Sequence, residues 1–479
     1  MGNLKIFIVA VFSFVGGYAL LKAISLIATE SDQPVIVVGL VIGMGLLVMV
    51  GLILKKREYY LYIYLLLFPF LAIYQKGVNL SVVFSLLFII NYKGELFSAK
   101  VFNKPLVGVA HLLILGAALV TAPFSHDFGT TKQYVLMYAA AFIFLNVFTL
   151  EINSAKKIKR VGNILIFLFF FCCLISLYQK VFGITSIQLF TGGYNTNTTF
   201  GVYSARIPSI FWDPQIAGLY FGLMIILLAG YFTTVSKSPA FFVITVLMGS
   251  LAIFFSLTRV AIIAFALGGF FVFLFQKRSL VSKVVTVLIF VIPFIFMANQ
   301  YFRDSSFETS KRMSGKYMVE SFNYRADLWQ NGLAIFASHP LGVGLGGLNQ
   351  YEAGVKIGLT NLNTYETRAG TQFESAVLDV LCSLGIFGGA GVVLLLLLFF
   401  GKGFYLSKMA EDVPSLHLSV FLMGGMICLL VCGLTSPVNR NDHVVFLFVL
   451  LLGLMNALET VVIERRKIIS NENEIFDKL

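Results

Sequence analysis

The chain has 479 residues, of which 58% are hydrophobic and 12% are charged, and its mean hydropathy is +0.89. Apolar runs of about 18 to 22 residues recur along it, the length that crosses a bilayer as an α-helix, and this excludes a soluble globular protein. The net charge of +12 does not indicate a nucleic-acid-binding protein, because the basic residues form short clusters beside the apolar runs.

The apolar runs predict an all-α polytopic membrane protein with about fourteen transmembrane helices. We keep the first run as a span because it is too long for a signal-peptide core and lacks a clear cleavage site. The fourth run is short, and only Thr258 and Arg259 separate the ninth from the tenth. The predicted spans are residues 4–28, 34–54, 59–75, 78–92, 105–122, 134–150, 161–179, 211–232, 240–257, 260–276, 281–299, 374–401, 416–435 and 443–463.

The distribution of lysine and arginine predicts the orientation of these spans. Clusters such as Lys55–Arg57, Lys156–Arg160 and Arg465–Lys467 fall in alternate connections, which we assign to the cytoplasm together with the amino terminus. The other short connections hold few basic residues. Arg259 therefore lies at an external turn between two spans and not in the middle of the membrane.

Two external segments are long enough to carry a site. The first runs from about residue 183 to 215. The second, residues 300–373, is the long loop between the eleventh and twelfth spans. Within it FNYRADLWQNGLAIFASHP has helical spacing that Pro340 closes, and the glycines of LGVGLGGLNQY predict a tight turn. The segments divide the chain into residues 1–182, 183–299, 300–373 and 374–479.

Polar residues gather at the external ends of the predicted spans. Single arginines at such places are often interfacial anchors, His339 is typical of a helix end, and Glu374 fits the last solvated residue before a span. Asp379, one turn deeper, is costly to bury and is expected to pair with a polar group on a neighbouring span. The candidates are Arg206, Arg259, Arg325, His339, Glu374 and Asp379.

Several arginines on one face suit a substrate that carries pyrophosphate. Guanidinium groups bind phosphate oxygens bidentately and keep their charge at physiological pH. They would also stabilise a departing pyrophosphate without a metal ion. A nearby carboxylate, such as that of Glu374, would serve as a general base for an incoming sugar hydroxyl. No metal and no cofactor is expected, because the cysteines lie inside apolar runs and HPLGVGLGG lacks the ending of a phosphate loop.

The order of four motifs resembles the bacterial O-antigen polymerase and ligase superfamily, which includes the Wzy-type polymerases. The chain carries R-x-P-S-x-F-x-D-P from Arg206, then S-x-T-R ending at Arg259. The long loop follows with R-x-x-x-W and H-P-L-G-x-G-x-G, and E-S-x-x-L-x-x-L-x-x-x-G-I-x-G opens the next span at Glu374. The resemblance covers residues 206 to about 395.

The resemblance implies a metal-independent, inverting glycosyltransferase with a GT-C-like fold. Its donor would be an undecaprenyl-pyrophosphate-linked oligosaccharide at the external, periplasmic face of the bacterial inner membrane. Arg206 and Arg259 would bind the pyrophosphate, and Arg325 would assist or position the glycan. His339 would shape the loop over the cavity, and Asp213 is a further candidate for substrate binding.

Glu374 distinguishes members of this superfamily. Ligases usually carry a histidine at this place, whereas a Glu-Ser pair is found in many polymerases, so we favour a polymerase of O-antigen, capsule or exopolysaccharide repeat units. The alternatives are a ligase that transfers the glycan to lipid A-core and a flippase or transporter of lipid-linked sugars. The expected partners are the lipid-linked glycans, the bilayer, a chain-length regulator and a flippase of the pathway, and no nucleic acid.

Overall fold

The computed structural model describes residues 57–68, 80–125, 128–183, 206–211, 213–276, 315–345, 375–409, 414–436 and 438–476. These residues form helices and no strand, which confirms the all-α class. Seven helices of the described residues are long and apolar enough to cross a membrane, and Arg259–Phe275 and Leu418–Leu434 are shorter apolar helices. The predicted spans 4–28, 34–54 and 281–299 lie outside the described residues, so the count of fourteen stays a prediction.

The helices follow the predicted spans closely. Proline at the first turn starts several of them, where its missing N–H costs no hydrogen bond. The bounds are α3 Glu58–Leu67, α4 Leu80–Tyr92, α5 Ala99–Phe102, α6 Pro105–Val109, α7 Gly116–Thr121, α8 Phe128–Glu151, α9 Ala155–Phe182, α11 Pro214–Thr234, α12 Pro239–Ser256, α13 Arg259–Phe275, α16 Gly315–Ser338, α18 Ala376–Lys408, α19 Leu418–Leu434 and α20 Asp442–Phe476. Short turns link them: η2 Lys93–Phe97, the π-helical η3 Ala110–Leu115, η4 Ala122–Phe124, η7 Pro414–His417 and η8 Val438–Arg440.

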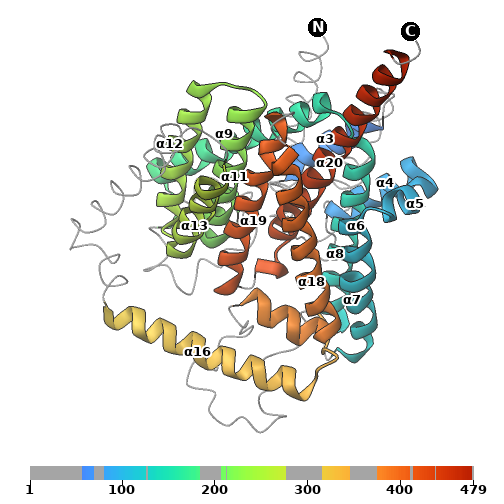
Figure 1. Ribbon diagram of the computed structural model, residues 1–479. Coiled ribbons are helices and arrows are strands. Elements are labelled where there is room, and N and C mark those ends of the chain that lie inside the picture. Colours follow the sequence, from blue (N-terminus) through green and yellow to red (C-terminus); the bar gives the residue numbers. More distant parts are fainter. Residues whose placement is uncertain are drawn as a thin grey trace, which may run out of the picture.

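Helix α11 lies at the centre of the bundle. Its apolar segment is 94% buried, and it packs against α9, α12, α13 and α19 (Figure 1). Glycines let the surrounding helices approach closely. A Cβ at Gly268 of α13 would come within 2.5 Å of the carbonyl oxygen of Gly424 on α19. Small residues at such crossings bring backbones together, as expected where packing rather than water drives helix association.

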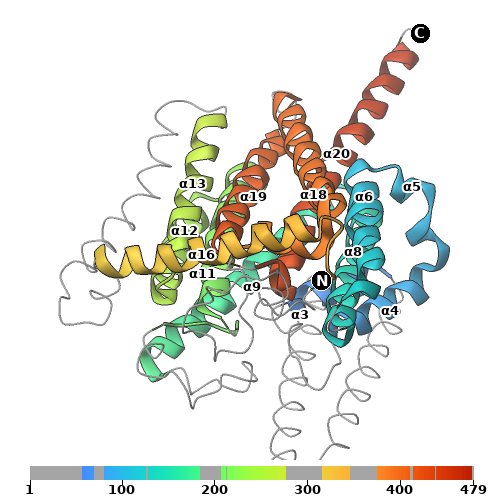
Figure 2. The same cartoon turned by 90° about the horizontal axis from the view of Figure 1, so that it is seen from below.

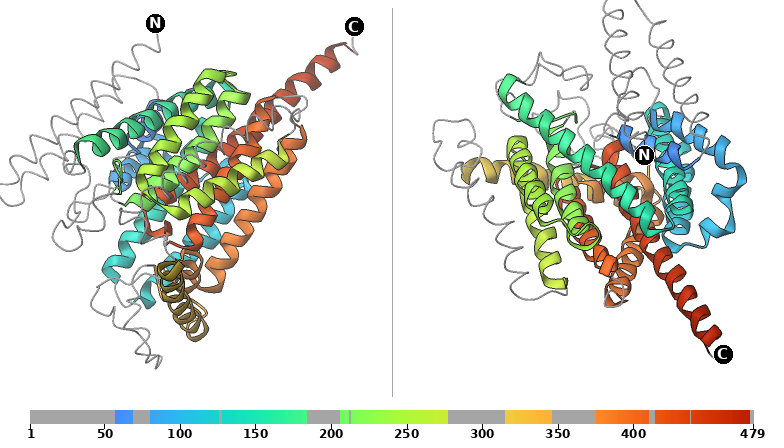
Figure 3. Two further views of the ribbon diagram at one scale, coloured as in Figure 1. Left: turned by 90° about the vertical axis from the view of Figure 1, so that its left-hand side faces the viewer. Right: turned by 90° about the horizontal axis from the view of Figure 1, so that it is seen from above.

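Helix α16 lies outside the bundle formed by the apolar helices. It runs across one end of the bundle, over the ends of α11, α18 and α19 (Figure 2), and it lies outside the bundle when seen from the side (Figure 3). This confirms the helix predicted within residues 322–340. The loop of residues 300–373 as a whole extends beyond the described residues and stays a prediction.

The two ends of the bundle carry different polar residues. We call the end that holds Arg206, Thr258, Ser375 and Arg440 the arginine end, and the other the opposite end. At the opposite end, Lys157 and Arg160 at the start of α9 both pair with Glu58 at the start of α3. Arg57, directly before α3, and Lys157 also share Glu151, so basic residues from two connections predicted to be cytoplasmic lie together. Which end faces the cytoplasm stays a prediction.

Candidate functional site

The segment that holds Arg206 is fixed to the turn between α12 and α13. Arg206 is 9% exposed, and its Nε donates to the carbonyl oxygen of Ser256, 3.2 Å away. Its Nη2 donates to the hydroxyl of Thr258 at 3.1 Å, and the N–H of Ile207 donates to the carbonyl oxygen of Phe255 at 2.9 Å. The guanidinium therefore has a defined place, set by neutral acceptors of a neighbouring turn.

The turn between α12 and α13 is tight because Leu257 is left-handed, with a φ of 49°. Thr258 then donates its hydroxyl to the carbonyl oxygen of Pro214 at 3.0 Å, which joins the turn to the start of α11. Gly218 makes the contact possible, because a Cβ there would come within 2.8 Å of the Ser256 hydroxyl oxygen. Arg259 is the first residue of α13 and half-buried, so the fold brings the Arg206 and Arg259 segments into one cluster.

Asp213 begins α11 within the same cluster. Its carboxylate accepts a hydrogen bond from the N–H of Gln215 at 2.7 Å, which satisfies a backbone donor of the first turn. Burial raises the pKa of Asp213, while the Gln215 N–H and the charge of Arg206 act to lower it. Asp213 therefore lies within electrostatic range of Arg206, and its local role is that of a helix cap.

Asp379 confirms the prediction of a buried, paired carboxylate. It is fully buried in the first part of α18, where its Oδ1 accepts from the Nε of Arg440 at 2.9 Å and also from Nη2. Its Oδ2 accepts from the side-chain amide of Asn439 at 2.5 Å. Ser375 caps this helix through its hydroxyl. Glu374, the predicted base, directly precedes Ser375 in the sequence and lies outside the described residues.

Helix α16 contacts the same part of α18. Ile335 of α16 is buried against Leu378 and Cys382, and the Cys382 thiol donates to the carbonyl oxygen of Gly332, 3.1 Å away. Arg325 lies half-buried on α16, and His339 is exposed directly after its end. The backbone N–H of His339 donates to Ile335, as the helix-end reading predicts. The described contacts do not join Arg325 or His339 to Arg206.

Helix α18 is interrupted at Gly385, and the turn after His339 supplies hydrogen-bond partners there. Gly385 has a φ of 65° and a ψ of −165°, which interrupts the helical hydrogen-bond ladder. The carbonyl oxygens of Cys382 and Ser383 accept instead from the N–H groups of Val343 and Gly344, at 2.9 and 3.0 Å. The N–H of Ile386 donates to the carbonyl oxygen of Pro340 at 2.9 Å. A turn from the long loop therefore supplies partners that the broken helix lacks.

Glycine is required where the turn meets the break. Gly342 and Gly344 have φ of 93° and 90°, a region that residues with a side chain rarely occupy. A Cβ at Gly385 would lie 2.3 Å from the carbonyl carbon of Leu341. The hydroxyl of Thr131 on α8 donates to the carbonyl oxygen of Leu345 at 2.8 Å. The predicted tight turn is confirmed for residues 341–345, which lie between α18 and the start of α8, and the rest of the predicted turn lies outside the described residues.

The sequence analysis missed the polar turn between α19 and α20. A single basic residue in a short connection, such as Arg440, is also explained by the orientation of the spans. The run VNRNDH places several polar residues in a short connection between two apolar helices, and this is the signal that could have identified the turn. Its residues reach both other parts of the site: Arg440 binds Asp379, and the ring of His443 lies 5.0 Å from that of Phe211, edge to face.

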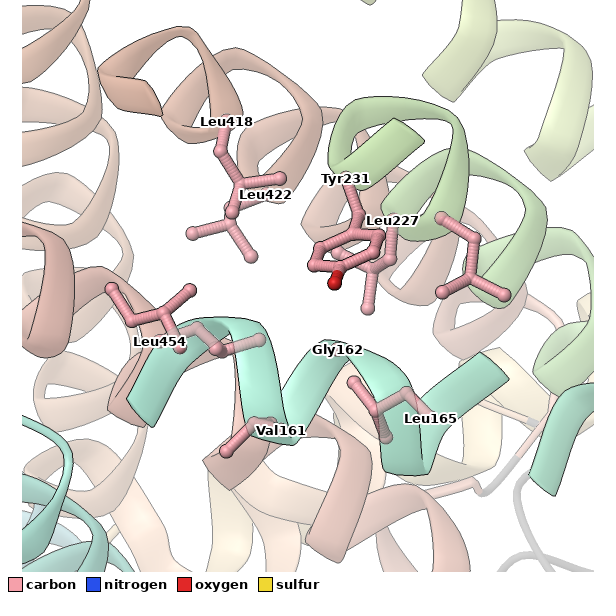
Figure 4. Close-up of a pocket in the computed structure, with 10 residues that line it drawn as sticks. Val161, Gly162, Leu165, Leu227, Tyr231, Leu418, Leu422 and Leu454 are labelled. Atoms are coloured by element: carbon pink, nitrogen blue, oxygen red, sulfur yellow. The ribbon is translucent and has the colours of Figure 1, made fainter. Parts of the chain in front are cut away.

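Two further features of the described residues concern metal ligands and cavities. They contain no group of three or more histidine, cysteine, aspartate or glutamate residues placed to hold a metal ion. A hollow of about 20 Å³ near the opposite end is lined by apolar side chains and Tyr231 (Figure 4), and it has room for about one water-sized molecule. It is too small and too apolar for a sugar or a pyrophosphate.

Comparison with known families addresses the same region. The family model described as O-antigen ligase matches residues 241–393, from α12 through the first half of α18. The match supports the resemblance of this region to the O-antigen ligase and polymerase superfamily. The match includes Arg259, Arg325, His339, Asp379 and the break at Gly385. No curated protein matches the chain.

The family assignment supports an enzymatic role and a membrane location. The superfamily consists of enzymes of the glycosyl-transfer type, and the apolar helices agree with a multi-pass membrane protein. The match does not separate polymerases from ligases, although the family's name favours a ligase-like activity somewhat.

Proposed function

We propose that the protein is a glycosyltransferase that polymerises lipid-linked oligosaccharide repeat units. Its donor is a growing glycan on undecaprenyl pyrophosphate, and its acceptor is a hydroxyl at the non-reducing end of a fresh repeat unit. The observation that supports this best is the cluster of Arg206 and Arg259 at one end of a membrane bundle, beside the region that matches the family. The fold is then of the GT-C-like kind, and no metal is used.

The reaction balances without a cofactor. The acceptor oxygen forms a bond to the anomeric carbon of the donor, and the bond from that carbon to the pyrophosphate oxygen breaks. The electron pair leaves with the lipid pyrophosphate, whose charge Arg206 and Arg259 stabilise. The hydroxyl proton passes to Glu374, and the configuration at the anomeric carbon inverts. Arg325 and His339 belong to the loop that positions the glycan, and Asp213 holds the start of α11 beside Arg206.

A ligase is the second candidate, and the name of the matching family favours it. Supplying purified protein in vesicles with lipid-linked repeat units alone separates the two activities. A polymerase lengthens the glycans, whereas a ligase leaves them unchanged until lipid A-core is added. If neither substrate mixture yields a new glycosidic bond, the proposal of glycosyl transfer is wrong.

A transporter of lipid-linked sugars is the rival from another class. Transporters place charged residues and broken helices near the midplane of the membrane. In the described residues, the candidate arginines lie at one end of the bundle. Movement of a labelled lipid-linked glycan across the vesicle membrane, with no change in glycan length, would favour the transporter. We expect the enzyme to act on the external face of the inner membrane, beside a flippase and a chain-length regulator.

A further inference from the structure

Arg440 has an orientation that its pair with Asp379 determines. The side chain comes from η8, between α19 and α20, and is 12% exposed. Its Nε and Nη2 both donate to Oδ1 of Asp379. The other oxygen of that carboxylate accepts from Asn439. Both oxygens of Asp379 are therefore engaged, and the remaining amino group of Arg440, Nη1, takes no part in the pair.

The turn that carries Arg440 is fixed from a second side. The hydroxyl of Tyr138 on α8 donates to the carbonyl oxygen of Asn439 at 3.1 Å. Together with the pair to Asp379, this contact holds the turn between α8 and α18. A side chain held in this way loses little entropy when it binds a ligand, because its geometry is set in advance.

One nitrogen of Arg440 remains available. Nη1 takes no part in the pair with Asp379. The guanidinium is therefore anchored by two nitrogens, the side chain as a whole is 12% exposed, and the third nitrogen lies outside the anchor. Anchored arginines of this kind suit phosphate, which accepts charge-assisted hydrogen bonds.

The position of Arg440 relates it to the proposed site. Three residues after it, His443 packs its ring against Phe211, which belongs to the same segment as Arg206. Its partner Asp379 lies one turn after Ser375, the residue that follows Glu374. The turn between α19 and α20 therefore contacts both sequence segments that the proposed chemistry uses.

We propose that Arg440 is a third substrate-binding arginine, which donates through Nη1 to a phosphate oxygen of the lipid-linked donor while Asp379 holds it in place. This inference rests on the proposed function. The rival explanation is a structural ion pair that only fastens α18 to the turn. The two differ in what a neutral replacement does, because asparagine and glutamine keep hydrogen bonding between the positions but carry no charge.

The test uses the full-length protein with the double substitution Asp379→Asn/Arg440→Gln. This variant avoids the buried unpaired carboxylate that Arg440→Ala would leave. We expect it to fold, as judged by thermal unfolding in detergent, and to raise KM for the lipid-linked donor about ten- to a hundred-fold. We expect Arg440→Lys to raise KM less, because the charge remains. Arg160→Ala, which removes an arginine from an ion pair at the opposite end, is the matched control and should keep the wild-type KM.

A KM within about two-fold of wild type for the folded double variant would show that the pair is structural only, and the inference would be wrong. A binding measurement separates this outcome from failure of the proposed function. If the wild type forms no glycosidic bond with any substrate mixture, titration of the detergent-solubilised protein with undecaprenyl pyrophosphate still tests Arg440. Weaker binding by the double variant than by wild type supports the inference, and equal binding, or none by wild type, overturns it.

Discussion

The two ends of the bundle hold their cations in different ways. At the opposite end the partners are carboxylates: Arg57 lies 2.7 Å from Glu95, and both Lys104 and Lys402 lie 3.0 Å from one oxygen of Glu459. At the arginine end, the hydrogen bonds described for Arg206 go to a carbonyl oxygen and a hydroxyl. Ion pairs at the opposite end satisfy charges within the protein, whereas the two hydrogen bonds that orient Arg206 are accepted by neutral groups.

The difference between the two ends indicates which arginines are candidates for a functional role. Where a carboxylate neutralises an arginine at a helix end, helix packing and the orientation of the spans in the membrane are enough to explain why the arginine is there. An arginine that neutral acceptors orient, such as Arg206, is the better candidate for binding an anionic ligand. Arg440 combines both features, because a carboxylate orients it and one nitrogen remains.

The largest effect on activity, and the clearest test of a difference between the two ends, is expected from Arg259→Ala. Its loss removes positive charge at the proposed leaving group, and we expect kcat for chain extension to fall by about 10²- to 10³-fold. The measurement is extension of lipid-linked repeat units in vesicles. Arg160→Ala at the opposite end should retain near-normal activity. Equal losses in both variants, or none in either, would erase the functional distinction between the two ends.

A large effect on stability is expected from Asp379→Asn. This substitution leaves Arg440 largely buried beside a neutral amide, and breaking a buried pair in this way costs about 3 to 5 kcal/mol. Thermal unfolding in detergent measures the loss. Adding Arg440→Gln should recover much of it, because the unpaired charge is then gone. If Asp379→Asn alone is as stable as wild type, the pair of Asp379 and Arg440 contributes nothing to the free energy of unfolding.

A smaller effect is expected at the break in α18. Gly385→Ala forces a side chain into a left-handed position and into contact with Leu341, which costs about 1 to 3 kcal/mol from the backbone alone. Gly401→Ala is the control in the same helix, because nothing lies within 4 Å of a Cβ there, and it should stabilise the helix by about 0.5 to 1 kcal/mol. The two unfolding temperatures should shift in opposite directions.

The smallest effect concerns Asp213 and pH. Its pKa in the folded protein is raised by burial, so its charged form destabilises the fold, and this penalty grows as the pH rises through that pKa. Asp213→Asn keeps a capping oxygen and loses the charge, so it should unfold at or above the wild-type temperature at neutral pH. The two proteins should converge below the ordinary pKa of aspartate. Asp213→Ala, which also loses the cap, should cost about 1 kcal/mol.

The sequence predicted the local structure of the chain better than it predicted which distant residues contact one another. Apolar runs and prolines set the helix bounds, and the close succession of two runs placed Arg259 at a turn. The depth of Asp379 in its span indicated a buried partner but not which one, because the partner lies about sixty residues away in a different connection. Arg440 was overlooked because a basic residue between two spans also serves orientation.

The break in α18 was beyond the reach of sequence patterns. Glycine is common in membrane helices, and SLGIFGG reads as a continuous apolar run. The backbone angles of Gly385 and its contact with residues 340–344 show the interruption, and neither can be derived from the apolar pattern. For Arg206 and Arg259, the sequence indicated a shared end, and the structure adds the hydroxyl of Thr258 that links their segments.

The hydrogen bonds between the break in α18 and the turn of residues 340–344 affect any attempt to exchange loops between relatives. In a bilayer each unpaired backbone group costs several kcal/mol, so residues 340–344 and 382–386 must be inherited as a matched set. A chimera joined anywhere between them would combine a foreign turn with a native break and leave carbonyl oxygens without donors. Exchange of the whole stretch from α16 through Ile386 keeps both sides of this fit from one parent.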